Sequence, residues 1–176
     1  LIFFIYFKKK FNLKYHLFVI TRNKKNFIKI FQNKNIDNQV NIIEIDLSKS
    51  IDFKKLKFNF KYVFHCAANY YLGKNKKKYY SNININNNLI KIAKNCKPKA
   101  IIFLSSGSAK YASLNSTNYD YKTSKLKCEN DLKSKLPNIK IVLTRLYTFI
   151  GPLMEFKSFF AIGNFILSAV QNKKII

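Results

Sequence analysis

Short, almost continuously apolar segments alternate along the chain with longer segments in which apolar residues recur at helical spacing. Apolar runs without polar alternation are typical of parallel strands in a sheet that is covered on both faces. Helix-length segments between such strands indicate strand-helix-strand units. The pattern therefore predicts an α/β fold with a doubly wound parallel sheet. The expected strands are residues 17–21, 41–46, 62–68, 100–106 and 139–147, and the expected helices are residues 2–13, 84–95 and 121–136.

The charge of the chain has a compositional explanation. The 176 residues include 33 lysines and arginines against 8 acidic residues, which gives a formal net charge of +25. Only Arg22 and Arg145 are arginines, and the over-used residues (Lys, Asn, Ile, Phe and Tyr) share A- or T-rich codons. Proteins that read phosphates or bases depend on the arginine fork. Biased base composition therefore explains the lysines, and the asparagines between 84 and 88, better than a nucleic-acid partner does. A lysine-rich polyanion-binding module is the alternative.

Cysteine usage and hydropathy bear on location. The three cysteines have no CxxC spacing, which argues against a disulfide framework or a zinc site and favours a reducing compartment. We therefore expect a cytoplasmic protein without a metal. No segment reaches the roughly 18 to 20 consecutive apolar residues that a membrane span requires, so no membrane partner is expected.

Candidate chemistry lies just after the fourth and before the fifth expected strand. Ser106 and Ser108 follow an apolar run at a strand end, where ligands of open α/β sheets bind. Tyr121 and Lys125 are four residues apart and share one helix face. An ammonium beside a phenol lowers the phenol pKa from about 10 and makes it usable as an acid or base near neutral pH. Taken alone, this pair is more typical of a solvated helix face. His65 is interpreted as a packed strand residue.

Six segments together resemble one enzyme family. The segments are VFHCAANYY (63–71), SNINI (81–85), IIFLSSGSAKY (101–111), YKTSKLKCEN (121–130), RLYTFIGP (145–152) and FAIGNFI (160–166). Their order and spacing resemble the extended short-chain dehydrogenase/reductase family, in its NAD(P)-dependent nucleotide-sugar epimerase, dehydratase and reductase branch. The resemblance covers almost the entire chain.

The resemblance implies a catalytic group. Tyr121 would be the acid/base that moves the hydroxyl proton while hydride passes to or from the nicotinamide. Lys125 would lower the phenol pKa and hold the nicotinamide ribose. Ser106 would bind the reacting oxygen, with Ser108 as the rival candidate. Asn82 matches a family asparagine that orders the helix beside the site, or is one more asparagine from biased composition.

The resemblance also implies how the cofactor binds. Asp46 and Leu47 match the residues past a strand that meet the adenine, and Ala67 and Ala68 match small residues that let the cofactor approach. Arg22 stands where an acidic residue would bind the ribose of NAD, and a cation there suits the 2′-phosphate of NADP. NADP is therefore favoured over NAD.

The downstream segment implies a nucleotide-sugar substrate. Asn164 matches an asparagine that contacts the sugar nucleotide's diphosphate, whereas Thr148 departs from the asparagine of many relatives. Gly107 and Ser108 replace the Asp-Glu pair of relatives that dehydrate. Epimerisation or reduction of a keto-sugar is therefore expected, and a homodimer is plausible by resemblance.

The family's opening strand and GxxGxxG loop have no counterpart in the sequence. We therefore expect residues 1–147 to be an incomplete NAD(P)-binding Rossmann-like domain and residues 148–176 to begin a substrate-binding lobe. As a fragment of a longer enzyme the chain would be inactive alone. A non-catalytic or decaying relative of the family is the alternative.

Overall fold

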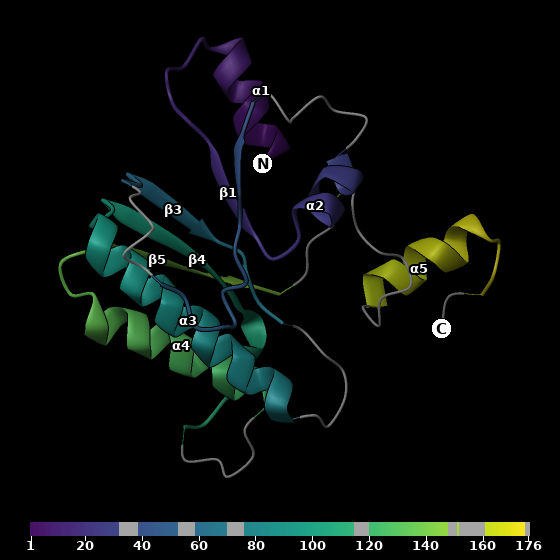
Figure 1. Cartoon of the computed structure of the whole chain (residues 1–176). Coiled ribbons are helices and arrows are strands. Elements are labelled where there is room, and N and C mark those ends of the chain that lie inside the picture. Colours follow the sequence, from purple (N-terminus) through teal and green to yellow (C-terminus); the bar gives the residue numbers. More distant parts are fainter. Residues whose placement is uncertain are drawn as a thin grey trace.

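Strands and helices alternate along most of the described chain. The computed structural model describes residues 1–31, 39–52, 59–69, 76–114, 120–147, 151 and 161–174. Paired strands run parallel, which confirms the α/β fold class. The elements are α1 (Ile2–Lys10), β1 (Phe18–Thr21), α2 (Lys24–Phe31), β2 (Asn41–Glu44), β3 (Tyr62–His65), α3 (Lys76–Cys96), β4 (Ala100–Ser106), η3 (Gly107–Tyr111), α4 (Tyr121–Lys135), β5 (Lys140–Leu146) and α5 (Ala161–Val170) (Figure 1).

The described strands form two parallel sheets, one of β1 and β2 and one in the order β3-β4-β5. β1 and β3 share no backbone ladder in the described segments, although side chains near both ends of the two strands meet. The rings of Phe18 and Phe60 lie 5.5 Å apart at the amino ends of the two strands. At the carboxyl ends, Arg22 Nη1 donates to Asn69 Oδ1 over 3.4 Å. The sheet that the sequence predicts is thus divided between β1 and β3.

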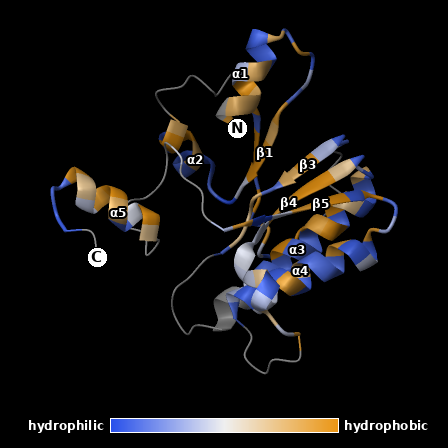
Figure 2. Cartoon of the chain, turned by 180° about the vertical axis from the view of Figure 1, so that it is seen from behind, coloured by the Kyte–Doolittle hydropathy of each residue, from blue (hydrophilic) through white to orange (hydrophobic). Residues whose placement is uncertain are grey.

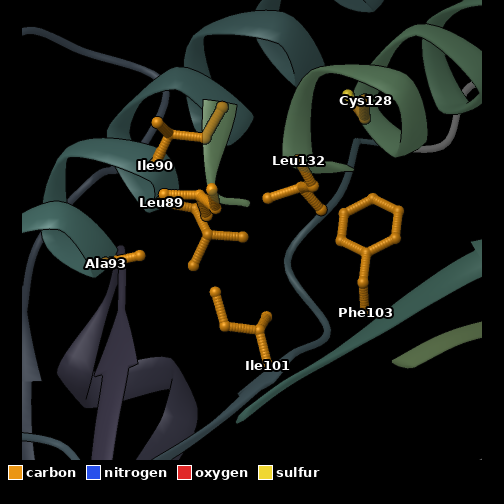
Figure 3. Packing of buried hydrophobic residues seen from close by; sticks show 8 residues of the cluster. Leu89, Ile90, Ala93, Ile101, Phe103, Cys128 and Leu132 are labelled. Atoms are coloured by element: carbon orange, nitrogen blue, oxygen red, sulfur yellow. The ribbon is translucent and has the colours of Figure 1, made fainter. Parts of the chain in front are cut away.

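α3 and α4 pack side by side against one face of the larger sheet (Figure 1). Alternate residues of a strand face opposite sides of the sheet, and Ile101 and Phe103 of β4 face these helices with 0% and 2% of their surface exposed. This core fixes both helices over the strands that carry the candidate chemistry. Its other buried members are Leu89, Ile90, Ala93, Cys128, Leu132 and Leu136 (Figure 3).

The opposite face of the larger sheet is less covered. Phe64 of β3 and Val142 of β5 lie in the same cross-strand row and are 49% and 39% exposed. Apolar residues run along β3, β4 and β5 in Figure 2. Phe4 of α1 reaches this row, with its ring centroid 4.7 Å from that of Phe64. The described helices therefore cover the two faces unequally.

The smaller sheet has a core of its own. Ile5 of α1 and Val40, just before β2, are its buried members. Partly buried Val19 and Ile42 contribute from the strands, and Phe27 contributes from α2. The smaller sheet therefore packs against α1 and α2.

Two buried asparagine side chains of α3 hold the loops that follow β2 and β3. Asn88 Nδ2 donates to the carbonyl oxygens of Leu47, over 2.8 Å, and Lys49, over 2.7 Å. Asn82 clamps one residue, since its Oδ1 accepts the N–H of Asn69 at 2.7 Å and its Nδ2 donates to the Asn69 carbonyl at 3.0 Å. The expectation that base composition alone explains the α3 asparagines is therefore wrong for Asn88.

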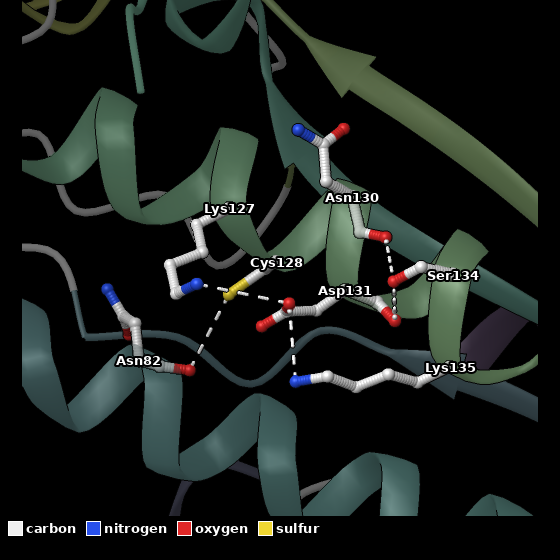
Figure 4. A network of polar contacts seen from close by, with 7 residues as sticks. All are labelled: Asn82, Lys127, Cys128, Asn130, Asp131, Ser134 and Lys135. Carbon is white, nitrogen blue, oxygen red and sulfur yellow. Dashed lines mark hydrogen bonds and ion pairs between the residues drawn. The ribbon is translucent and has the colours of Figure 1, made fainter. Parts of the chain in front are cut away.

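Polar contacts also join α3 to α4 and brace α4 itself (Figure 4). The Cys128 thiol donates to the Asn82 carbonyl over 3.7 Å. Asp131 pairs with Lys127 at 4.0 Å and Lys135 at 3.3 Å, and both lysine side chains are close to half exposed. Exposed ion pairs of this kind contribute little to stability. The packing of α3 against α4 therefore depends mainly on the apolar core.

Several elements differ from the sequence expectation. α1 ends at Lys10, before the expected residue 13, because Asn12 adopts the left-handed conformation with φ 46°. α3 begins at Lys76, well before the expected residue 84. The sequence did not indicate its first turns, because they are rich in lysine and have no apolar period. Neither α2 nor α5 was expected. None of the helices that the structure describes is long and apolar enough to cross a membrane.

His65 is packed in the larger core, as the sequence indicates. Its side chain is 5% exposed, and its ring stacks on that of Phe103 with centroids 5.4 Å apart. Burial, and secondarily the nearby charge of Lys125, lowers the pKa of His65 from 6.5 to about 3. The folded protein therefore keeps this imidazole neutral.

The Asn88 clamp should be measurable as stability. Asn88→Ala leaves the Leu47 and Lys49 carbonyls without their buried donor, which should lower the free energy of unfolding by about 1–3 kcal/mol. Urea unfolding measures this change. Asn95→Ala, at an exposed position of the same helix, should stay within about 0.5 kcal/mol of wild type. Equal effects of the two substitutions would show that the clamp contributes nothing.

Acid should destabilise the fold through His65. Below pH 6.5 His65 binds a proton in the unfolded chain, whereas in the folded chain it binds this proton only near pH 3. Stability is therefore complete above pH 6.5 and falls with decreasing pH, by at most about 1.4 kcal/mol per unit from this group. Urea unfolding of wild type and His65→Phe between pH 6.5 and about 5, above the range where carboxylates titrate, should show a flatter slope for the variant. The same slope in both proteins would refute this assignment.

Candidate active site

The two candidate hydroxyls lie together where β4 ends. The chain turns at Ser106 directly into η3, and Ser106 Oγ accepts the N–H of Ser108 over 3.3 Å. The two side-chain oxygens are 2.9 Å apart and share a hydrogen bond. Both candidates for holding the reacting oxygen therefore occupy one point at the carboxyl end of the strand.

Gly107, between these serines, is required by a neighbouring ring. A Cβ placed on Gly107 would lie 2.5 to 2.8 Å from three ring atoms of Tyr147, which follows β5. No side chain fits at position 107 with the ring in this place, so a hydroxyl at the turn comes from Ser106 or Ser108. Tyr147 is 68% exposed, and its ring forms a wall beside the turn.

Asp120 fixes the start of α4 and thereby places Tyr121. The Asp120 carboxylate caps the helix by accepting the N–H of Thr123 at 2.9 Å. Capping aspartates favour helix initiation and complement the helix dipole. Tyr121 is consequently the first residue of the helix and partly buried, at the end of α4 that packs against η3 and β4.

Lys125 lies one turn further along α4 and points at β4. Its ammonium donates to the Leu104 carbonyl over 2.9 Å and lies 5.0 Å from the Phe103 ring centroid. It also lies 5.9 Å from the Tyr121 ring centroid. Lys125 is 4% exposed, and burial lowers its pKa, although nearby Glu129 opposes this shift. The structure therefore brings Tyr121 and Lys125 together. The strand residue that Lys125 contacts, Leu104, lies two residues before Ser106.

A buried carboxylate next to this group escaped the sequence analysis. Glu129 is 1% exposed and accepts hydrogen bonds from Ser105 Oγ at 2.5 Å, Arg145 Nε at 3.0 Å and Arg145 Nη2 at 2.6 Å. Burial raises the pKa of Glu129, but the hydrogen bonds from Arg145 and Ser105 outweigh it, and the net pKa lies below its usual value. The available signal was spacing, because Tyr121, Lys125 and Glu129 follow one another at intervals of four.

The candidate cofactor residues follow β1, β2 and β3. Arg22 is exposed after β1. Asp46 Oδ1 accepts the hydroxyl and the N–H of Ser48, whose hydrogen bonds lower the pKa of Asp46. Ala67 and Ala68 are exposed after β3. Arg22 reaches the end of β3 through Asn69, and the Leu47 carbonyl is bound by Asn88 of α3.

The remaining candidate is separate from this group. Asn164 is exposed on α5, and Figure 1 shows α5 apart from both sheets. Thr148 lies outside the described residues, as do Pro152 and Phe160 of the quoted segments. In the part of the chain that the structure describes, no three His, Cys, Asp or Glu side chains gather as a metal site would require.

The chemistry available at the end of β4 is proton exchange. A phenol next to a cation can act as acid or base, because the cation stabilises the phenolate. The serine hydroxyls can donate to, or accept from, an oxygen of a bound molecule. Together these groups suit a substrate that carries a hydroxyl or a carbonyl.

Comparison with known proteins identifies the family of the chain. The model of the NAD dependent epimerase/dehydratase family matches residues 8–176. The chain resembles the UDP-glucuronic acid 4-epimerase from Bacillus cereus in complex with NAD (TM-score 0.70, 22% identity, 92% of this chain and 57% of that one). It also resembles the UDP-N-acetylglucosamine 4-epimerase from Methanobrevibacter ruminantium in complex with UDP-N-acetylmuramic acid (0.68, 25%, 89% and 56%). A dTDP-glucose 4,6-dehydratase from Bacillus anthracis is similar as well (0.67, 15%, 98% and 58%).

The chain spans less than two thirds of the length of these solved structures. No match was found among curated proteins. The family match, in contrast, extends over nearly all of the sequence and includes the strand end, the Tyr121 helix and α5. The chain therefore belongs to the NAD dependent epimerase/dehydratase family.

Proposed function

We propose that this chain carries the Ser/Tyr/Lys site of an NAD(P)-dependent epimerase or keto-reductase that acts on a nucleotide sugar. The observation that carries the proposal is the Lys125 ammonium, buried between the Tyr121 ring and β4 directly before the paired hydroxyls of Ser106 and Ser108. Buried lysines are rare unless their charge is used or paired. A solvated helix face, the alternative for this spacing, would leave Lys125 exposed.

In the proposed mechanism, Tyr121 as phenolate takes the proton from a substrate hydroxyl while the adjacent carbon loses hydride. Lys125 keeps the phenolate form accessible through its positive charge. Ser106, supported by Ser108, holds the substrate oxygen as it becomes a carbonyl. Bound NAD(P) supplies the hydride acceptor and donor. The Tyr121 phenol returns the proton in the reverse step, which is common to epimerisation and reduction.

The residues around the site fit the adenosine and ribose parts of such a cofactor. Arg22, Asp46, Ala67 and Ala68 follow three parallel strands, where dinucleotides bind in this fold. Small exposed alanines leave room for a close approach. The sequence has no GxxGxxG loop to hold a pyrophosphate at a helix N-terminus. We therefore propose that the isolated chain binds NAD(P) poorly and is inactive.

Nucleotide sugars are the proposed substrates because solved relatives of the chain are epimerases and dehydratases named for them. Asn164 remains the candidate contact to the diphosphate. Dehydration stays disfavoured, since Gly107 has no room for the acidic side chain that would follow the strand-end hydroxyl. The proposal includes a cytoplasmic location and a homodimer.

The role of Tyr121 is best tested in a complete enzyme. A chimera in which this chain replaces the matched segment of the Methanobrevibacter ruminantium epimerase keeps the parts of that enzyme that this chain does not cover, and circular dichroism reports its folding. Tyr121→Phe should lower kcat by about 10²–10⁴, because proton transfer by a positioned side chain contributes that much. The chain alone should give turnover no higher than the buffer blank.

Tyr111→Phe is the matched control, because Tyr111 is 71% exposed at the end of η3. It should change kcat by less than about threefold, as surface substitutions usually do. A folded, active chimera whose Tyr121→Phe variant keeps normal turnover would exclude Tyr121 as the acid/base. Robust turnover by the isolated chain would exclude the proposed inactivity.

Cofactor preference is testable on the chain itself with adenosine fragments of the two cofactors. Arg22 should favour 2′,5′-ADP, which carries the 2′-phosphate, over 5′-AMP. Arg22→Asp should reverse this preference in titration calorimetry. Lys24→Asp makes the same charge change two residues away at an exposed position and should preserve the preference. An unchanged preference in Arg22→Asp would rule out this role.

A further inference from the structure

Two successive turns of α4 hold two successive residues of β4. Lys125 donates to the Leu104 carbonyl over 2.9 Å, and Glu129 accepts the hydroxyl of Ser105 over 2.5 Å. The next residue of the strand is Ser106, which carries a proposed catalytic hydroxyl. The position of α4 along the axis of β4 therefore determines where the side chains of α4 lie relative to the Ser106 hydroxyl.

The Glu129 contact is the more restrictive of the two. A buried carboxylate is costly unless it is paired and hydrogen-bonded, and Glu129 meets this requirement only at one place. Arg145 of β5 lies opposite Ser105 of β4 in the parallel register, and it offers Glu129 two guanidinium donors at 3.0 and 2.6 Å. Two strands and a helix are thereby locked at a single point. Sliding α4 by one residue, about 1.5 Å, would separate the carboxylate from its donors.

We propose that Glu129 is a positioning residue, which acts through Ser105 and Arg145 to hold the Lys125 ammonium beside Tyr121 and Ser106. This inference rests on the proposed function, in which these three groups carry the chemistry. Glu129 itself faces Ser105 and Arg145 and contacts neither the phenol nor the strand-end hydroxyl among the described contacts.

The position also has an electrostatic consequence. Glu129 lies one turn beyond Lys125 on the same helix face, and its negative charge partly opposes the burial that lowers the Lys125 pKa. A carboxylate held there therefore favours the charged form of the ammonium. Coulomb interactions in a poorly hydrated site depend strongly on distance, so a small displacement of Lys125 changes how well it stabilises the Tyr121 phenolate.

The test measures the titration of Tyr121 in the 176-residue chain, and it requires no turnover. Tyrosines labelled with ¹³C at Cζ report their ionisation by NMR, and Tyr121→Phe identifies the resonance. Lys125→Met gives the full contribution of the ammonium. Glu129→Gln and Ser105→Ala should each raise the Tyr121 midpoint towards the Lys125→Met value, by about half a pH unit or more, because a displaced ammonium stabilises the phenolate less. The direct effect of removing the Glu129 charge would be the opposite, a lower midpoint.

Matched controls separate positioning from general loosening of the fold. Asp131→Asn neutralises another carboxylate of α4, and Ser134→Ala removes another hydroxyl of that helix, whose bond to the Asn130 carbonyl is exposed. Neither should move the Tyr121 midpoint. Ser105→Ala leaves the pair of Glu129 and Arg145 intact, so this variant carries the test if Glu129→Gln fails to fold.

The outcomes distinguish this inference from the proposed function. Wild-type midpoints in folded Glu129→Gln and Ser105→Ala, together with a raised midpoint in Lys125→Met, would show that Glu129 is only structural and overturn the inference. An unchanged midpoint in Lys125→Met would instead remove the proposed activation of Tyr121. Raised midpoints in all three variants, with unchanged controls, would establish the positioning role.

Discussion

The need of loop backbone groups for hydrogen-bond partners is the constraint on which the candidate site depends. Buried carbonyls without a donor are costly, and the loops after β2 and β3 obtain their donors from Asn88 and Asn82 of α3. No ladder joins the two sheets in the described segments. α3 therefore connects the two sheets. Its apolar face packs against the sheet of β3, β4 and β5, and its Asn88 amide binds the loop that follows β2 of the smaller sheet.

Charge is used sparingly inside this very basic chain. Lys125 and Glu129 are its buried charged side chains in the described segments, and they lie one turn apart on the helix that begins with Tyr121. Each is compensated differently: Lys125 by a carbonyl and two ring faces, and Glu129 by a guanidinium and a hydroxyl. Apart from the Tyr121 ring, the compensating groups come from Phe103, Leu104 and Ser105 of β4 and from Arg145 of β5. The same strand ends thus supply the fold's internal electrostatics and the proposed chemistry.

The strands were predictable because burial leaves a direct mark on sequence. β4 has the limits that its apolar run predicts, β1 begins one residue later than expected, and β5 is one residue shorter at each end. β2 and β3 end two and three residues before their expected limits. α2 was missed because its eight residues make only about two turns, although Phe27, Ile28, Ile30 and Phe31 share one helix face, and α5 because its sequence was interpreted only as a ligand motif. Pattern analysis finds apolar periods, and short or polar helices show them weakly.

The candidate site was predictable where chemistry follows local spacing and hidden where it depends on distant segments. Tyr121 and Lys125 share a helix face, so their proximity could be inferred. Glu129 and Arg145 are joined only by the packing of α4 on β5, and composition could not distinguish buried Asn86 and Asn88 from exposed Asn84. The uncertainty between Ser106 and Ser108 has a physical basis, since their oxygens share one hydrogen bond.

The division between β1 and β3 has a consequence for the behaviour of the chain in solution. Each of these strands presents a backbone edge that no described strand pairs, and such edges are templates for association with another chain. Repulsion between copies with a net charge of +25 opposes this contact. Added electrolyte weakens that repulsion, because the Debye length falls from about 30 Å at 0.01 M to about 8 Å at 0.15 M. Ionic strength therefore determines how strongly copies of this protein repel one another at these edges.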